Sequence, residues 1–278
     1  MTQAATPADL TITPRPLHID RDAVTPRWWL NNDPYGTAVL NALSLTFPDG
    51  ERFFIQSVKR FARDAPPRLA ADICAFTIQE GAHTREHMAF NAITAQAGYE
   101  TAEIEAYVTR RLDIARARPA IAQLAATMAL EHFTATFAHA LLADPDILQG
   151  SPESLGRLWR WHSIEEIEHK GVAYDVFLHA TRDLSRARRG RIRRWAMLLT
   201  TLHFMQTVRE TTLMLLRQDG LKGLRARFGL FSWLWLKPGL YRRLVGDYVI
   251  FFRPGFHPWQ IDDRDLIARA EVSLATAT

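Results

Sequence analysis

Two motifs rich in glutamate and histidine have the spacing of metal ligands on a helix. The first contains Glu80, His83 and His87, and the second contains His162, Glu166 and His169. Side chains three and four positions apart share one face of an α-helix, so each trio projects within a narrow arc. Apolar residues lie on the same faces, and buried ionisable groups are costly unless they are paired or bind a metal. The duplicated pattern predicts a metal site; the alternative is a pair of interior hydrogen-bond networks.

Two single glutamates on other predicted helices extend this set. Glu131 lies within the apolar run MALEHFTATF, and Glu51 follows a break at FPDG. With the two Glu-x-x-His pairs they supply four carboxylates and two imidazoles, the ligand set of two-metal carboxylate bundles. Four carboxylates neutralise two divalent ions, and oxygen ligands with imidazole suit iron or manganese. We therefore predict two iron ions, or manganese, held by Glu51, Glu80, His83, Glu131, Glu166 and His169.

Several motifs together resemble a known bacterial family. They are FPDGERFF, QEGAHTREH, the Glu131-His132 pair, WHSIEEIEHKGVAYD and RPGFHPW. The sequence over residues 25–260 is similar to the family described as predicted metal-dependent hydrolases, which belongs with the ferritin-like proteins. The resemblance implies a ferritin-like fold and a metal-dependent activity.

A narrower resemblance concerns the second motif. His162-x-x-x-Glu166-x-x-His169 is similar to the last ligand helix of the di-iron arylamine N-oxygenases, in which an added histidine makes a seven-ligand site. This resemblance implies that His162 is a third imidazole ligand; the alternative is a hydrogen-bonding residue beside the ligands. His87 is then left over, as a residue that supports the ligands or as a base that faces the substrate. We name it as the candidate catalytic residue.

The other titratable residues near these motifs are expected to have other roles. Glu86, Glu165 and Glu168 lie farther round their helices, so we expect them in solvent or hydrogen-bonded to ligands. His132 points about 100° away from Glu131 and is not predicted as a ligand. The single cysteine, Cys74, is expected to be a small core residue, and it excludes an intrachain disulfide and a thiolate zinc cluster.

The elements that must position these residues are helices. Apolar residues recur at three- and four-residue spacing, and period-two alternation is absent, so we predict an all-α fold. Four long helices between residues 35 and 181 suit a ferritin-like four-helix bundle with additional C-terminal helices. The predicted helices span residues 35–63 (interrupted near residues 48–50), 68–98, 101–116, 119–142, 151–181 and 191–217.

The same patterns predict the domain organisation. We expect a flexible N-terminal arm over residues 1–24, one ferritin-like domain over 25–260 with a helical extension from about residue 190, and a tail over 261–278. The first twenty residues lack the apolar stretch of a secretory signal, so a cytoplasmic protein is expected. Residues 195–216 contain charged side chains, which argues against a membrane span. The tryptophan-rich segment 228–236 is expected to pack on the bundle; alternatives are a dimer contact or peripheral contact with the inner membrane.

The charge is mildly basic, with 34 lysines and arginines against 30 acidic residues. Seven arginines fall within residues 182–194. Such a cluster could bind phosphate, an anionic membrane or an acidic partner such as a ferredoxin-type electron donor; the alternative is a solvated loop. Aromatic residues do not interleave with it, so no nucleic acid is expected as a partner.

These features favour an O₂-activating di-iron enzyme. With O₂ as co-substrate, it would hydroxylate, N-oxygenate or desaturate a small hydrophobic or aromatic substrate in a pocket walled by residues such as Phe76, Phe90, Phe133 and Phe137. The first alternative is a two-metal hydrolase that attacks an ester or phosphoester with an activated water. The second is metal storage or sensing without catalysis, against which the large C-terminal extension argues.

Overall fold

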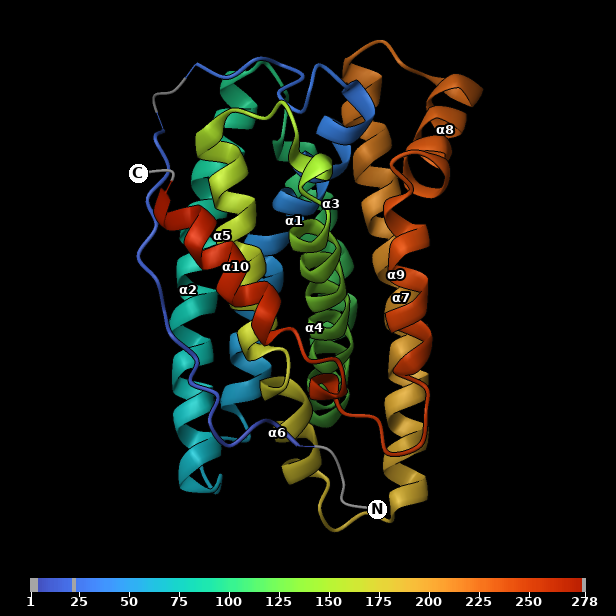
Figure 1. The fold of residues 1–278 in the computed structure, drawn as a ribbon. Helices are drawn as coiled ribbons and strands as arrows, with labels where there is room; N and C mark the ends of the chain where they lie inside the picture. Colours follow the sequence, from blue (N-terminus) through green and yellow to red (C-terminus); the bar gives the residue numbers. More distant parts are fainter. Residues whose placement is uncertain (1–4, 22–23, 277–278) are drawn as a thin grey trace.

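The computed structural model describes residues 5–21 and 24–276, and in these ranges the fold is all-α, without a strand (Figure 1). This confirms the predicted fold class. The helices are α1 (Pro34–Lys59), α2 (Pro67–Gln96), α3 (Ala102–Arg116), α4 (Ala120–Ala143), α5 (Glu153–His169), α6 (Val172–Ala180), α7 (Arg186–Gln218), α8 (Gly223–Phe231), α9 (Leu240–Ile250) and α10 (Arg264–Thr276). Short helical turns cover Pro145–Leu148, Ser232–Leu236 and Pro258–Gln260.

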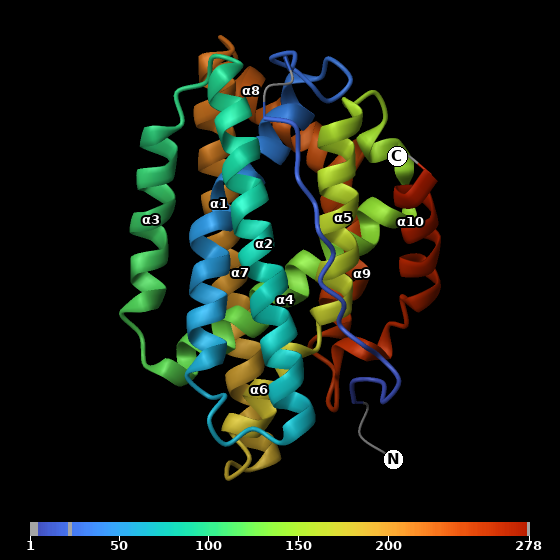
Figure 2. The ribbon, with the colours of Figure 1, turned by 90° about the vertical axis from the view of Figure 1, so that its left-hand side faces the viewer.

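Helices α1, α2, α4 and α5 form the four-helix bundle that carries the predicted ligands. Helix α1 contacts α2 and α4, and α5 contacts α2 and α4, so the four close around a common interior. Helix α7 packs along α1 and α4, and α3 covers the side of α1 next to α7 (Figure 2). The C-terminal helices α9 and α10 pack against α4 and α5, in agreement with the predicted additional helices.

Local sequence signals set the ends of these helices. The side chain of Asp33 accepts hydrogen bonds from the backbone N–H groups of Tyr35 and Gly36 and caps α1. Ser185 caps α7 in the same way, by accepting from the N–H of Arg188. Helix α2 ends before Gly98, whose φ of 92° is a left-handed conformation that glycine adopts without steric cost.

Three boundaries differ from those predicted. Helix α1 continues through Pro48, because packing between α2, α4 and α7 holds it together despite the missing N–H. The helix predicted over residues 151–181 is divided into α5 and α6 around Gly171, where a Cβ would lie 2.6 Å from Thr6 Oγ1 and 3.0 Å from Trp259 Cδ1. The arginine cluster is not an interhelical loop, because from Arg186 onward it forms the first turns of α7.

Both chain ends pack on the bundle. We expected a flexible arm over residues 1–24, but its described part includes Ile12, Leu17 and Ile19, each at most 7% exposed. Residues 1–4 and 22–23 lie outside the described part of the chain. The predicted tail contains α10, which buries Leu266 and Ile267 in a cluster with residues of α4 and α5. Packing of apolar side chains therefore places described parts of the predicted arm and tail against the bundle.

The tryptophan-rich segment 228–236 packs in part, as expected, with Leu230, Trp233 and Leu234 buried and Phe228 exposed. No helix in residues 5–21 and 24–276 has both the length and the hydropathy of a membrane span.

A buried ion pair ties α10 to the end of α5. Lys170 Nζ donates to Asp263 Oδ2 at 2.5 Å and to the carbonyl of Ile261 at 2.7 Å. The two charged side chains are 4% and 5% exposed, and Asp263 Oδ1 also contacts His139 Nδ1 of α4 at 2.8 Å. A single carboxylate thus joins α4, α5 and α10.

We predict that Asp263→Asn destabilises the protein by about 3 kcal/mol, because it leaves the ammonium of Lys170 buried without a counter-charge. The matched control is Asp262→Asn, whose ion pair with Arg264 is solvent-exposed and contributes little. Urea unfolding of the two variants measures the difference. Equal stability of both variants would show that the Lys170–Asp263 pair does not hold α10 in place.

Candidate metal centre

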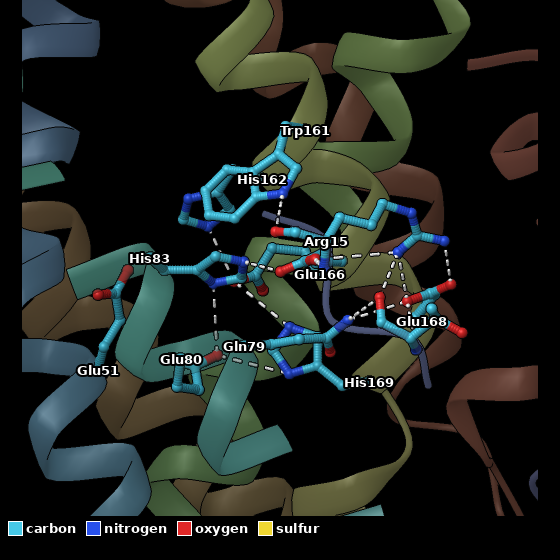
Figure 3. Close-up of polar contacts among 12 residues, drawn as sticks. Arg15, Glu51, Gln79, Glu80, His83, Trp161, His162, Glu166, Glu168 and His169 are labelled. Carbon is cyan, nitrogen blue, oxygen red and sulfur yellow. Dashed lines mark hydrogen bonds and ion pairs between the residues drawn. The ribbon is translucent and has the colours of Figure 1, made fainter. Parts of the chain in front are cut away.

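The bundle brings the side chains of both motifs into one buried cluster, of which Figure 3 shows Glu80 and His83 beside His162, Glu166 and His169. Helix α1 supplies Glu51 and α4 supplies Glu131, while α2 and α5 each supply a trio. All eight residues are buried, none more than 4% exposed. They are Glu51, Glu80, His83, His87, Glu131, His162, Glu166 and His169. The structure therefore places every sequence-predicted site residue together, and their assignment as ligands stays a prediction.

The cluster divides into two groups whose donor atoms lie close enough together to hold a metal ion. In the first, one ligand atom from each of Glu80, His83, Glu166 and His169 lies within 4.8 Å of the others. In the second, the same holds for Glu51, His87 and His162.

Glu131 belongs beside the first group, because its Oε2 is 3.8 Å from His169 Nδ1. His87, predicted as a catalytic residue rather than a ligand, thus lies where it could ligate together with Glu51 and His162.

Many polar atoms of this cluster have no hydrogen-bond partner within the described chain. Buried polar groups in proteins are nearly always hydrogen-bonded, so each exception requires an explanation. A pair of cations in the cluster would satisfy these atoms, and the donor set of carboxylates and imidazoles suits divalent iron, manganese or zinc. The atoms are Glu51 Oε1, Glu80 Oε1 and Oε2, His83 Nδ1, Glu131 Oε1 and Oε2, Glu166 Oε2, and His169 Nδ1 and Nε2.

Glu165 orients one of the histidines. Its Oε2 lies 3.0 Å from His83 Nε2, and its Oε1 accepts a hydrogen bond from the backbone N–H of Arg15 at 2.6 Å. With a proton on Nε2, the free Nδ1 of His83 faces the carboxylates of Glu80 and Glu166, at 3.8 and 3.5 Å. Carboxylates that hold a ligating histidine in this way fix its tautomer and strengthen it as a ligand.

The N-terminal segment covers the outer side of this network. The guanidinium of Arg15 forms an ion pair with Glu168 at 2.7 Å, and Gln79 Nε2 donates to the same carboxylate at 2.9 Å. Glu86 accepts a hydrogen bond from the backbone N–H of Ile19 at 3.1 Å. Glu86 and Glu168 are therefore buried and hydrogen-bonded rather than solvated. Spacing within a helix gives no sign of a partner some 150 residues away.

His87 ends a chain of hydrogen bonds that leads to the predicted ligands. Its Nδ1 is 2.8 Å from Ser44 Oγ, and its Nε2 is 2.6 Å from His162 Nδ1. The other nitrogen of His162, Nε2, is 2.9 Å from Glu166 Oε1. The rings of Phe47 and Trp159 pack against His87, at centroid distances of 4.7 and 5.4 Å. The two histidines are thus held in fixed orientations within an apolar surrounding.

Burial and mutual repulsion shift the protonation of the carboxylates. Burial raises the pKa of Glu51 to about 8. Burial, with repulsion from Glu131 and Glu166, raises the pKa of Glu80 well above its usual value. Burial also raises the pKa of Glu131 well above its usual value. At neutral pH these acids hold protons that a bound cation would have to replace.

The imidazoles divide into two kinds. Burial lowers the pKa of His162 to about 4. Burial, together with the charges of His162 and His83, also lowers the pKa of His87 well below its usual value. Burial acts in the same direction on His83, but the nearby carboxylates of Glu165 and Glu166 outweigh it and raise its pKa to about 10. His87 and His162 are therefore neutral rings with a lone pair, the form in which histidine binds a metal.

A cavity of about 850 Å³ lies between α1, α3, α4 and α7, and Glu51 forms part of its wall. This volume is in the range of small-molecule sites. Its aromatic lining consists of Phe47, Phe53, Phe54, Trp195 and Phe204.

The pocket predicted from Phe76, Phe90, Phe133 and Phe137 is therefore not this one. Phe133 and Phe137 line a second, smaller cavity, whereas Phe76 and Phe90 are core residues.

Two further residues were predicted to have no role at the site. His132 lies outside both groups, with Nε2 3.0 Å from the carbonyl of Asp247. Cys74 is exposed, so its prediction as a core residue was wrong.

Comparison with known proteins gives one match. The family model described as "Predicted metal-dependent hydrolase" matches residues 13–262, which include the N-terminal segment around Arg15 and every predicted ligand. No curated protein and no solved structure matches the chain.

We predict that Glu80→Gln and Glu166→Gln each reduce the bound metal below two ions per chain, because a neutral amide is a weaker ligand than a carboxylate. Elemental analysis after dialysis against Mn(II), or against Fe(II) without oxygen, measures the stoichiometry. Glu153→Gln is the control, since Glu153 is an exposed residue of α5 that pairs with Arg160. Two metals retained in both cluster variants would contradict the ligand assignment.

Acidification is expected to weaken metal binding. A cation must displace the protons held by Glu51, whose pKa is about 8, and by Glu80 and Glu131, whose pKa values are also raised. Below pH 8 more of these protons are present, so the affinity for Mn(II) falls as the pH falls toward 6. Calorimetry in two buffers with different heats of ionisation measures the protons released per metal. Binding without proton release and independent of pH would contradict this picture.

Proposed function

The chain belongs to the family of predicted metal-dependent hydrolases, and on this premise we propose that it is a two-metal hydrolase of an ester or phosphoester. The observation that carries the proposal is the position of Glu51. This residue belongs both to the buried carboxylate–histidine cluster and to the wall of the large cavity. A substrate in the cavity would thus reach the cluster directly.

Two divalent cations, when bound, would lower the pKa of a water molecule and polarise the bond to be cleaved. The residues that would hold them are Glu80, Glu131, Glu166, His83 and His169 in the first group, with Glu51, His162 and His87 in the second. The first group is rich in carboxylates and balances positive charge, whereas the second has two neutral rings and a single acid.

The chain's own residues prepare the reaction site. Glu51 Oε2 accepts a hydrogen bond from Thr84 at 2.8 Å, while its Oε1 has no partner in the described chain and is available to a cation or to the attacking water. Ser44 and Glu166 hold the His87–His162 pair from both ends. Glu51 is buried among apolar cavity walls, and the lower local dielectric strengthens the electrostatic interactions around it.

A second candidate is O₂-dependent oxidation by a di-iron, or di-manganese, centre. The observation that favours it is the ligand set, which combines four carboxylates with imidazoles on four helices of a bundle. O₂ would then be the co-substrate, an apolar organic molecule would be oxidised, and a ferredoxin-type protein would supply electrons. The apolar cavity suits either reaction.

We expect divalent metal to confer hydrolysis of p-nitrophenyl esters or phosphoesters in the absence of oxygen. The assay compares metal-free protein with protein loaded with Mn(II), Zn(II) or Fe(II). Glu166→Gln is expected to lower the rate at least a hundredfold, because it removes a carboxylate from the centre of the cluster, whereas Glu153→Gln keeps it. If no ester is cleaved, and the Fe(II) protein instead consumes O₂ with a transient visible absorption band, the second candidate replaces the first.

A further inference from the structure

The large cavity changes in character from its buried part to its open end. Its buried walls include Phe53, Phe54, Val108 and Ala125, and Glu51 lies among them. Its exposed lining includes Arg118, Arg188 and Arg191, which come from the α3–α4 connection and the first turns of α7. The apolar side chains of Ile114, Trp195 and Leu199 are exposed beside them. An apolar interior and a basic opening together indicate an elongated ligand with two chemically different ends.

The charge at the opening is not neutralised by the protein. None of the cavity arginines (Arg111, Arg118, Arg188, Arg191) forms an ion pair with a carboxylate of the described residues. Arg111 contacts instead the neutral groups Gln206 Oε1, at 3.0 Å, and His203 Nδ1, at 2.9 Å. Glu51, at the buried end, is the single acid in the lining.

The opening carries a positive potential. Partial burial, followed by the nearby charges of Arg111 and Arg118, lowers the pKa of His203, which also lines the cavity. An anion placed there would find several cationic partners, and the lining holds no carboxylate other than Glu51.

The cavity is long as well as large. On α7 alone its lining extends from Arg188 to Thr207, which at the helical rise of 1.5 Å per residue is about 28 Å. A compact anion such as phosphate would occupy only the opening and leave the apolar walls unfilled. A neutral apolar molecule would leave the arginines without a partner.

We propose that the cavity binds a single-chain anionic amphiphile, with its carboxylate or phosphate head group at Arg118, Arg188 and Arg191 and its apolar chain directed toward Glu51. The inference rests on the proposed function in one respect only. It places the bond to be cleaved in the part of the ligand that lies near Glu51. Binding itself requires neither metal nor turnover.

The experiment measures ligand binding to the metal-free, full-length protein by displacement of a fluorescent fatty acid. The probes are dodecanoate, dodecyl phosphate, dodecanol and dodecyltrimethylammonium, the ionic probes below their critical micelle concentrations and dodecanol below its solubility limit. We expect the two anions to bind at least tenfold more tightly than the cation of the same chain length. Since an exposed ion pair contributes up to about fivefold in affinity, the triple variant R118Q/R188Q/R191Q is expected to bind the anions roughly tenfold more weakly or worse, with dodecanol unchanged.

A matched variant separates the head-group site from the general charge of the arginine cluster. R182Q/R186Q/R194Q removes the same number of charges from residues outside the cavity lining, so anion affinity should stay within about twofold of wild type. Ala126→Phe fills the apolar part and should abolish binding of the anions and of dodecanol. Far-UV circular dichroism verifies that each variant is folded.

Several results would overturn the proposal. The first is equal affinity of the wild-type protein for the anionic and the cationic probes. The second is an equal loss of anion affinity in the two triple variants. The third is unchanged probe binding in a folded Ala126→Phe variant. A vesicle arm separates free amphiphile from bilayer lipid: binding to phosphatidylglycerol vesicles without binding of monomeric probes would also reject the cavity as the site. Loss of hydrolysis with intact amphiphile binding, in contrast, would refute the proposed function and leave this inference standing.

Discussion

The burial of several carboxylates in one interior is the constraint on which the rest of the structure depends. Glu51, Glu80, Glu131 and Glu166 come from four helices, and isolated buried carboxylates are among the costliest groups to remove from water. Protons offset part of this cost in the metal-free chain, as the raised pKa values of the first three show. Two cations would offset more of it, and they would also satisfy the oxygen and nitrogen atoms that lack partners. Burying these four carboxylates is thus costly without bound cations, and the same arrangement is well suited to hold metal ions.

The surroundings of the cluster supply what a reaction would need. Carboxylates outside the cluster orient a histidine on one side, and a long apolar cavity reaches Glu51 on the other. Hydrolysis and O₂-dependent oxidation make similar demands on such a scaffold, since both need held metals, a dry cavity and a substrate placed beside them. The family's description favours hydrolysis, while the ligand set is also that of oxygen-activating bundles.

The all-α bundle and the clustering of the predicted ligands could be read from the sequence, because helical periodicity places Glu80 and His83 on one face and their apolar neighbours bury that face. What could not be read depends on contacts between distant segments. The partnership of His83 with Glu165 joins two helices, and Trp259 packs closely on Gly171, which lies between α5 and α6. Periodicity gives the buried side of a helix but not the neighbour it meets, so the aromatic walls of the cavity were assigned to the wrong residues.

The packed N-terminal segment has a consequence for how the centre is made. Arg15 emerges early from the ribosome, but its partners Glu165 and Glu168 follow some 150 residues later, as do the predicted ligands of α5. No partial chain that lacks α5 can enclose both groups of ligands. A metal centre that uses both groups could therefore assemble only after α5 has been synthesised, whereas helices α6 to α10 would still follow.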